Sequence, residues 1–563
     1  MLRLAGRPLL AAVCLAACGC EGTSAFGGRA KSSRMEPVVR VIETVSRTGR
    51  GLPGPVTTAG ERTQLRQLYQ GSANMPLWLN ASGDLRTVGK AAIQLLINAD
   101  KDGLRPEDYA ANQLESLAQR TGAEKSAAPD TVGRLDAGLS LALLRYLRDI
   151  HAGRVNPRSV GLAMQPPRER HDYVVLLGRA AREGDLGDVV AELEPPLAQY
   201  RLVRDALARL RKQGVDSIAE TPLTIPVPLK AGAAVPGLDA LARRLVETGD
   251  LPAQSATASF PRYEGILLDA VRRFQYRHGL APDTVLGKET VQELNVPLSW
   301  RAHQLELALE RLRWLRDLAN EPFLLVNIPM FELTAWNSPS DQGPPAFRTG
   351  VIVGKALDTE TPVLVEEMRY IIFQPYWNIP LSIARDETIP DIEKNRDFLR
   401  KNDMEIVQGQ GDDADPVELS DEALERVARG ELRIRQRPGP ENALGPIKFV
   451  FPNDQNVYLH GTPAEQLFDR SRRDFSHGCV RVEDPTGLAE WVLRDQPEWT
   501  RERIVDAMDD LTRKSRRVSL ARPLTVLLFY STAVVEADGT MRFGQDIYGH
   551  DRRLDGALHL ASR

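Results

Sequence analysis

The chain has 563 residues, too many for one hydrophobic core, so the length predicts several domains. Hydrophobic residues make up 42% and charged residues 26%, a balance that is ordinary for folded proteins and argues against global disorder. The formal net charge is only -4, and the Arg residues are scattered among Asp and Glu, so we expect no nucleic-acid partner.

The first residues have the features of an export signal. Arg3 and Arg7 precede an apolar run at positions 9–17, which is too short to span a bilayer. The run leads into Leu-Ala-Ala-Cys at positions 15–18, which resembles the lipobox of bacterial lipoproteins. We therefore interpret residues 1–17 as a lipoprotein signal peptide and Cys18 as the lipidated residue.

The alternative is a simple signal peptide that is cleaved near Ala17. Both interpretations predict export. With the lipid, we expect the protein at the periplasmic face of the cell envelope, anchored in a membrane, and the sequence does not distinguish the inner membrane from the outer.

Cysteine usage points to one residue. Cys14, Cys18 and Cys20 lie at the N-terminus, which leaves Cys479 alone in the folded part of the chain. A single thiol cannot belong to a disulfide framework, and in an oxidising compartment it is a liability unless it has a use. A buried structural cysteine is the alternative at this stage.

The first half of the chain divides into a linker and a helical region. Residues 18–60 are rich in Gly, Ser, Thr, Arg and Pro and are interpreted as a flexible tether. Residues 61–220 have apolar side chains at helical spacing with Gly and Pro between the segments, which predicts a mainly helical domain. A Pro-rich stretch at 221–236 indicates a domain boundary.

Residues 236–297 resemble a small three-helix peptidoglycan-binding domain. Ala270, Val271 and Phe274 lie on one face of a predicted helix, and Gly279 and Pro282 form the turn that follows it. The resemblance implies binding to glycan. A generic helical hairpin is the alternative.

The last part of the chain, residues 300–555, changes from a helix to a series of strands. We expect the helix at 302–318 and strands at 323–328, 331–334, 348–353, 370–373, 447–451 and 457–459. Residues 382–433 are charged and helical in pattern and interrupt the strands, which predicts an inserted lobe. Such a lobe either gates access to a site or is inert.

Two histidines flank the lone cysteine. His460-Gly461-Thr462 is followed, sixteen positions after His460, by a segment that runs from Ser476 to Arg481 and contains His477, Gly478 and Cys479. A thiol attacks an amide as the thiolate, and a nearby imidazole can take its proton and later return it to a leaving amine. Glycine beside the nucleophile lets the backbone approach the reacting carbonyl, where amides around Gly478 and Cys479 can stabilise an oxyanion.

This pattern resembles the signature of L,D-transpeptidases with a YkuD-type catalytic domain. Further similar elements are spread over residues 300–555, and Met-Pro-Leu-Trp at 75–78 resembles the scaffold region of the long members. The resemblance implies that Cys479 is the nucleophile and His460 the base. It also implies that the Gly461 carbonyl orients the imidazole and that Gly478 belongs to the catalytic set.

The same resemblance implies a substrate-binding set around these groups. It consists of Ser476, His477, Arg481, Arg473, Tyr376 and Trp377. The overall prediction is an α+β multidomain protein with a helical scaffold, a three-helix peptidoglycan-binding domain and a mainly β catalytic domain that carries a helical inserted lobe.

The implied reaction is acyl transfer between peptidoglycan stem peptides. Cys479 would be acylated by a tetrapeptide stem with release of D-alanine, and an amine of another stem would then accept the acyl group to form a 3-3 crosslink. The expected partners are peptidoglycan stem peptides and glycan, and the resemblance also implies inhibition by carbapenems. We expect no cofactor and no metal.

Three other classes of protein fit the sequence less well. A zinc site would have only three ligands, from Cys479 and two histidines. A papain-like protease would use the same chemistry, but none of its local signature surrounds Cys479. A non-catalytic peptidoglycan-binding lipoprotein would rely on residues 236–297 alone, and the complete motif around Cys479 argues against it.

Overall fold

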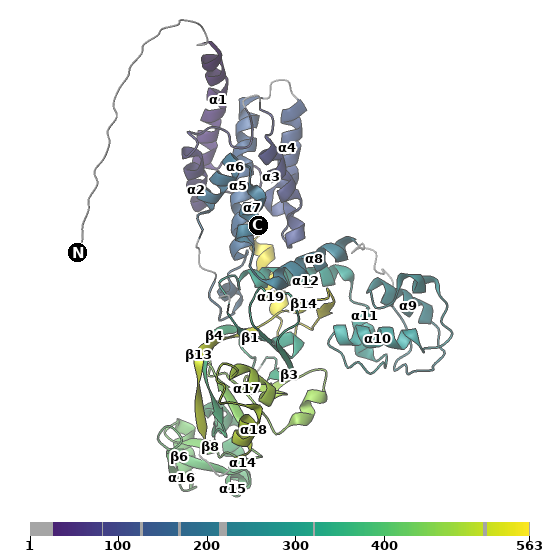
Figure 1. Cartoon of the computed structure of the whole chain (residues 1–563), viewed down its shortest axis with the longest axis vertical. Helices are drawn as coiled ribbons and strands as arrows, with labels where there is room; N and C mark the ends of the chain where they lie inside the picture. The colour runs from purple at the N-terminus through teal and green to yellow at the C-terminus, as the bar shows by residue number, and fades with distance from the viewer. Residues whose placement is uncertain are drawn as a thin grey trace, which may run out of the picture.

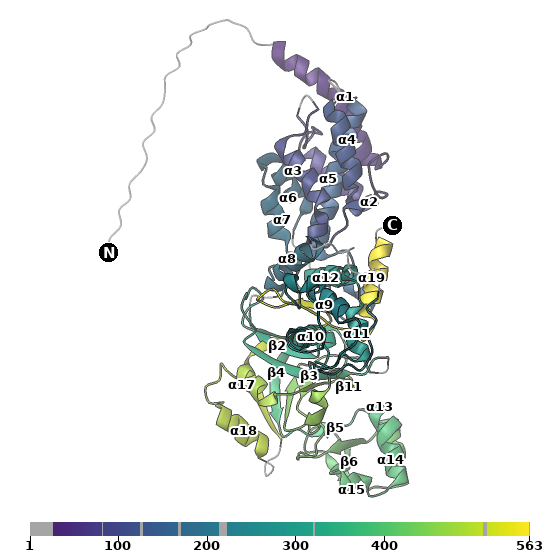
Figure 2. The ribbon, with the colours of Figure 1, turned by 90° about the vertical axis from the view of Figure 1, so that its right-hand side faces the viewer.

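The computed structural model describes residues 26–80, 83–123, 128–166, 171–212, 222–318, 321–357, 359–510 and 515–561. The molecule is elongated, with a helical region at one end of its long axis and a small lobe at the other (Figures 1 and 2). The signal peptide and Cys18 lie outside the described residues. No helix in the described ranges combines the length and the apolar character that crossing a bilayer requires.

The helical region is built around the long buried helix α5. Its helices, with the short turns η1 to η3 among them, are α1 (Phe26–Thr48), α2 (Ala59–Gln70), α3 (Thr87–Ile97), η1 (Ala99–Asp102), η2 (Pro106–Tyr109), α4 (Ala111–Ala123), α5 (Pro129–Ala152), η3 (Pro157–Val160), α6 (Tyr173–Glu183) and α7 (Leu186–Leu193). Their apolar faces share one core that extends from Met35 to Leu193. This agrees with the predicted helical scaffold.

Part of the predicted tether is a helix, so that interpretation was wrong for α1. Met35, Val38, Ile42 and Val45 are buried at helical spacing and join the scaffold core beside α5. The Gly- and Arg-rich composition of the surrounding segment obscured this apolar stripe.

Two helices connect the scaffold to the β domain. They are α8 (Ala198–Lys212) and α12 (Leu298–Arg313), which pack together and contribute to the core of the β domain. The buried Arg313 of α12 donates to the Asp102 carbonyl of the scaffold and to the Tyr200 hydroxyl of α8, the latter at 3.1 Å. These bonds tie the two regions together through satisfied polar groups rather than through a loose linker.

A three-helix unit lies beside α12 and has its own core (Figure 1). Its elements are α9 (Leu238–Glu247), η4 (Ala253–Thr257), α10 (Ile266–Arg277) and α11 (Lys288–Leu294). Arg277 donates to the Met541 carbonyl of the β domain at 3.1 Å, so the unit is attached to its neighbour. The helices agree with the predicted architecture, while binding of peptidoglycan by this unit stays a prediction.

The β domain is a nine-stranded sheet that closes on itself. Its strands are β1 (Phe323–Asn327), β2 (Glu332–Trp336), β3 (Phe347–Gly354), β4 (Leu364–Phe373), β9 (Ile447–Val450), β10 (Leu459–His460), β11 (Asp474–Ser476), β12 (Val480–Val482) and β13 (Arg516–Phe529). The order is β11-β3-β12-β10-β9-β4-β13-β1-β2, and β2 also pairs with β3. Closure through the β2–β3 pairing surrounds a continuous apolar core, while β11, whose one strand partner in the described sheet is β3, keeps one free edge.

Smaller elements complete the β domain. They are η5 (Ile328–Met330), η7 (Glu465–Asp469), α17 (Pro485–Val492), α18 (Arg501–Asp509), β14 (Ala533–Val535), β15 (Met541–Phe543) and α19 (His550–Ala561). Residues of α17, α18 and α19 belong to the same core as the barrel.

The inserted lobe is real, but the prediction that it is helical was incomplete. It contains a separate four-stranded sheet in the order β5-β8-β6-β7, formed by β5 (Trp377–Asn378), β8 (Arg433–Gln436), β6 (Met404–Gln408) and β7 (Asp415–Val417). Its helices are α13 (Leu381–Ile383), the π-helical turn η6 (Ala384–Thr388), α14 (Ile389–Lys394), α15 (Phe398–Lys401) and α16 (Asp421–Arg429). The strands are short and rich in charged residues, which hides the period-two pattern of a sheet.

Candidate active site

The thiol of Cys479 sits in the turn between β11 and β12, where the chain passes from one strand of the barrel to another. Cys479 is partly buried and its thiol forms no disulfide. Its Sγ lies 3.9 Å from the Asn456 carbonyl oxygen. The thiol is therefore held against the barrel wall while part of the residue remains accessible.

Ser476 shapes the turn that presents the thiol. Its hydroxyl donates to the Cys479 carbonyl at 2.6 Å and accepts from the Gly478 N–H at 3.2 Å. Gly478 has a φ of 107°, a conformation that side chains disfavour, so glycine is required for the turn. The Gly478 N–H already donates to Ser476 and is not available for an oxyanion, so the expectation that it stabilises one is revised. The Cys479 N–H, in contrast, makes no hydrogen bond to any described residue.

A second layer of hydrogen bonds fixes the same turn. The buried hydroxyl of Thr361 donates to the Gly478 carbonyl at 2.8 Å and accepts from the Gly354 N–H at 2.9 Å. Tyr548 donates to the Gly354 carbonyl at 2.6 Å. Residues more than a hundred positions apart thus hold one glycine in place.

His460 lies on the strand next to the thiol. Strands β10 and β12 are parallel, with Leu459 opposite Val480 and His460 opposite Arg481. The Nδ1 atom of His460 lies 2.5 Å from the Gly461 carbonyl oxygen, so Nδ1 carries the proton and Nε2 is left with its lone pair. Burial and the charge of Arg481 lower the pKa of His460 to about 3, which keeps the imidazole neutral.

Two cations face the thiol without carboxylate partners. Lys448 on β9 places its ammonium group 3.5 Å from the Tyr458 ring centroid, and Arg481 lies on β12. In the described ranges neither side chain forms an ion pair with a carboxylate. Burial lowers the pKa of Lys448 to about 8, and the negative charge of the Cys479 thiolate opposes that shift.

The charges of the two cations and the burial of the thiol shift the pKa of Cys479 in opposite directions. Burial raises the pKa of Cys479 above that of an ordinary thiol, while hydrogen bonds with Tyr458 and the charges of Lys448 and Arg481 oppose the rise. The resting nucleophile is therefore a neutral thiol beside a neutral imidazole.

His477 points to the inserted lobe rather than to His460. Its Nε2 lies 2.8 Å from Oε1 of Glu387, which belongs to the π-helical turn η6. This contact joins the lobe to the residue two positions before Cys479.

Tyr376 and Trp377 form the base of the lobe. The guanidinium of Arg435 lies 4.3 Å from the Tyr376 ring centroid. Trp377 is half-buried in β5 and forms a hydrogen bond with the Tyr458 side chain. Burial and the charge of Cys479 raise the pKa of Tyr458, and the hydrogen bond with Trp377 opposes that rise. Trp377 is thus linked to the thiol through one tyrosine.

Arg473 has other partners. Its guanidinium donates to the carbonyls of Phe468 at 3.1 Å and of Phe331 at 3.0 Å. These bonds support a structural role in holding the loop before β11, and a role in binding a substrate carboxylate stays a prediction.

Three residues of the site escaped sequence reasoning. Lys448, Tyr458 and Glu387 approach Cys479 or His477 from distant parts of the chain. The only sequence signal was the position of Tyr458, two residues before His460, on the same face of the strand.

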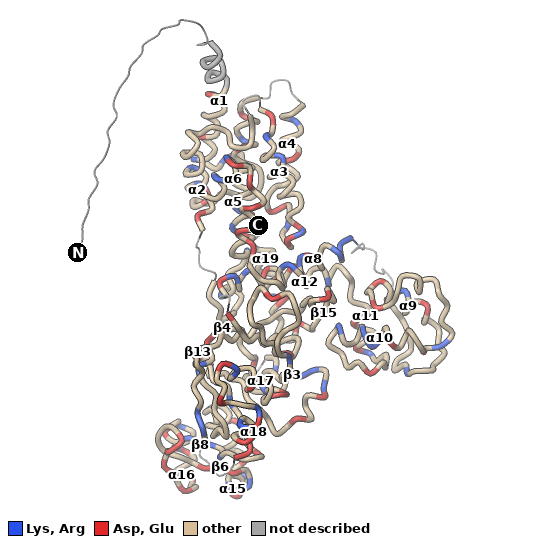
Figure 3. Tube along the Cα trace, in the orientation of Figure 1, with Lys and Arg blue, Asp and Glu red and all other residues tan. Residues whose placement is uncertain are grey.

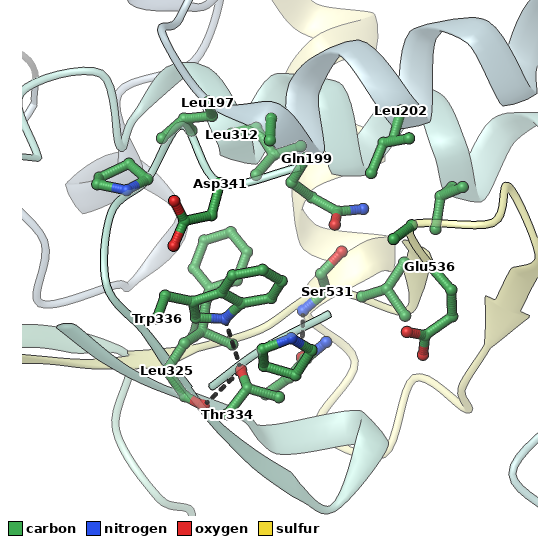
Figure 4. Close-up of a pocket in the computed structure, with 18 of the residues that line it drawn as sticks. Leu197, Gln199, Leu202, Leu312, Leu325, Thr334, Trp336, Asp341, Ser531 and Glu536 are labelled. Atoms are coloured by element: carbon green, nitrogen blue, oxygen red, sulfur yellow. Dashed lines mark hydrogen bonds between the residues drawn. The ribbon is translucent and has the colours of Figure 1, made fainter. Parts of the chain in front are cut away.

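The structure also describes a cavity of about 110 Å³ away from this turn, between α8, α12 and the β1, β2 and β14 strands (Figure 4). Leu312, Phe323 and Trp336 contribute to its apolar lining, which contains neither Cys nor His. Its carboxylate Glu536 is paired with Arg348 at 2.7 Å. We assign this cavity no chemical role.

No group of three metal-ligating side chains occurs in the part of the chain that the structure describes. Lys and Arg are interspersed with Asp and Glu along the described backbone trace (Figure 3).

Comparisons with known proteins find two matching regions of the chain. Residues 321–511 match the family model of the L,D-transpeptidase catalytic domain, and residues 63–207 match that of a scaffold domain. These two regions of the chain are thus similar to an L,D-transpeptidase catalytic domain and to the scaffold domain that precedes it.

A relative from Haemophilus influenzae is named "Putative L,D-transpeptidase". It is 30% identical over 281 residues, which cover 49% of this chain and 55% of the relative. The matched region therefore spans about half the length of that protein.

Proposed function

We propose that the protein is a cysteine-dependent L,D-transpeptidase that crosslinks peptidoglycan stem peptides. The observation that carries the proposal is the position of the Cys479 turn beside neutral His460 and two cations that lack carboxylate partners. The family match supports a transpeptidase role, and a non-catalytic peptidoglycan-binding lipoprotein is not favoured, because such a protein needs no such arrangement.

In the first step, Cys479 Sγ attacks the carbonyl carbon at the L-centre of the third stem residue. Because the resting thiol is neutral, its proton moves to Nε2 of His460 as the C–S bond forms. The Cys479 N–H is positioned to stabilise the oxyanion. His460 then gives the proton to the departing amine of D-alanine, and a thioester remains.

Lys448 and Arg481 bind the anionic part of the donor. The stem has carboxylates next to the scissile bond, and two cations without carboxylate partners favour such a ligand. In the second step an amine of another stem attacks the thioester, forms a 3-3 crosslink and releases the thiol.

The remaining proposals concern location and inhibition. Lipid attachment at Cys18 would tether the protein to a membrane at the periplasmic face, and residues 236–297 would bind glycan near the substrate. Carbapenems would acylate the same thiol, because their strained amide is an alternative acyl donor.

The test is mass spectrometry of the products that purified protein forms from a disaccharide tetrapeptide. We expect dimers joined between two third-position residues, together with free D-alanine. The Cys479→Ala variant should form neither, and products joined through the fourth residue would contradict the proposal.

A further inference from the structure

One side-chain contact joins the lobe to the nucleophile motif. Glu387 Oε1 accepts a hydrogen bond from His477 Nε2 at 2.8 Å, and His477 is two residues from Cys479. Glu387 belongs to η6, which Arg385 holds to α16 through a 2.6 Å bond to the Ala428 carbonyl. The carboxylate is therefore presented to the motif by a braced part of the lobe.

Stability does not explain this contact. The side chains of His477 and Glu387 remain 36% and 54% exposed, and exposed ion pairs contribute little to folding. The turn η6 is a π-helical segment inside an α-helical stretch, a feature that is common at functional sites.

The second step of the proposed reaction requires a group that binds and deprotonates the acceptor amine, and none of the catalytic groups named above has been given that role. The acceptor is an amine that is an ammonium ion at neutral pH, and it must lose a proton before it attacks. Lys448 and Arg481 repel that ammonium from their side of the thiol. Glu387 provides a negative charge on the side of His477.

Resting on the proposed function, we propose that Glu387 and His477 form the acceptor subsite. Glu387 attracts the ammonium group and, by accepting from Nε2–H, leaves the Nδ1 lone pair of His477 as the base that takes the first proton.

The step balances without another reactant. The ammonium gives one proton to His477, which passes it to solvent, and the amine nitrogen then attacks the thioester carbon. The N–C bond forms and the C–S bond breaks. The second nitrogen-bound proton moves through His460 to the leaving thiolate, so that an amide and a neutral Cys479 thiol result.

The experiment compares two acceptors on the full-length protein. Wild type and Glu387→Gln are supplied with a tetrapeptide donor and either diaminopimelate, which carries ammonium groups, or hydroxylamine, which is uncharged at the assay pH. D-alanine release reports acylation, and the ratio of transfer product to hydrolysed donor reports the second step. Asp386→Asn is the matched control, because Asp386 is an exposed neighbouring carboxylate in the same turn.

We expect Glu387→Gln to lower transfer to diaminopimelate about tenfold more than transfer to hydroxylamine. Asp386→Asn should resemble wild type. Equal losses with both acceptors, or no loss, would overturn the acceptor subsite while D-alanine release continues. Absence of D-alanine release in wild type would instead overturn the proposed function itself.

Discussion

The Nδ1 atom of His460 is hydrogen-bonded to the carbonyl oxygen of Gly461, the next residue in the chain, at 2.5 Å. This bond directs the Nε2 lone pair away from the backbone and leaves one tautomer for proton transfer. The strand pairing of β10 with β12 brings the same residue next to the Cys479 turn. The strand pairing and the Gly461 hydrogen bond support the proposal that His460, rather than His477, accepts the thiol proton in acylation.

The pH dependence of acylation follows from this pair. Because the pKa of His460 is about 3 and that of Cys479 is raised, both groups stay neutral from mildly acid to mildly alkaline pH. We expect the rate of D-alanine release to show no inflection from His460 near its ordinary pKa of about 6.5. Stopped-flow measurements across pH 5 to 9, roughly the range in which imidazole titrates, provide the check. An inflection that His460→Gln removes would mean that the histidine is charged at rest.

Removing His460 should abolish most of the acylation rate. We expect His460→Gln to lower kcat about 10²- to 10⁴-fold, because proton transfer in the transition state loses its base. His477→Gln should have a smaller effect on D-alanine release. Near-normal release by His460→Gln, with a large loss in His477→Gln, would reverse the roles.

Lys448 should control the reactivity of the thiol. Its positive charge opposes the burial that raises the pKa of Cys479, so Lys448→Met should raise that pKa further. Iodoacetamide alkylation at fixed pH should then be slower than in wild type. In wild type the benefit fades as pH rises through about 8, where Lys448 loses its proton. The exposed Lys394→Met is the control, and equal alkylation rates in all three proteins would rule out the effect.

Gly478 should be intolerant of any side chain. Its φ of 107° costs about 1–3 kcal/mol for a non-glycine residue, and relaxation of the turn would move the thiol. We expect Gly478→Ala to lose at least about tenfold in kcat/KM with a lower Tm. Gly439→Ala, at a glycine with open surroundings and no positive φ, should behave as wild type. An unchanged Gly478→Ala enzyme would show that the turn is not needed.

The buried pair between α12 and α19 should matter more for stability than any surface pair. Arg311 Nη1 lies 2.6 Å from Asp551 Oδ1, and both side chains are almost fully buried. Asp551→Ala should lower the free energy of unfolding by about 3–5 kcal/mol, because the guanidinium is left unpaired. Asp495→Ala, which breaks an exposed pair with Arg522, should cost at most about 1 kcal/mol. Denaturant melts of both variants test this, and similar midpoints would contradict it.

Local patterns were enough to single out Cys479 and His460 but not the residues around them. The lone body cysteine and its flanking histidines drew attention to this segment, the resemblance to L,D-transpeptidases implied the roles of Cys479, His460 and Ser476, and these roles stay predictions. Lys448 and Glu387 could not be singled out in this way, since each reaches the motif only when distant strands or the lobe fold against it. Arg473 illustrates the reverse: a suitably charged residue in the right segment donates to two backbone carbonyls.

The same distinction applies to the fold. The barrel strands β1 and β3 were predicted close to their observed bounds, while the helical spacing in residues 61–220 predicted a helical region without bounds for single helices such as α5. The lobe strand β8, with sequence Arg-Ile-Arg-Gln, is stabilised by pairing with β5 and β6 rather than by an apolar pattern of its own. Tertiary context of this kind is invisible to local patterns.

Trapping the acyl-enzyme tests the central claim most directly. Purified protein is mixed with a tetrapeptide stem, quenched in acid and digested, and the peptide that contains Cys479 is examined by mass spectrometry. The mechanism predicts that Cys479 carries the donor minus D-alanine as a thioester, and that an added amine releases this adduct. The Cys479→Ser variant should show no peptide of the thioester mass. D-alanine release by Cys479→Ala at the wild-type rate, or an adduct on another residue, would contradict it.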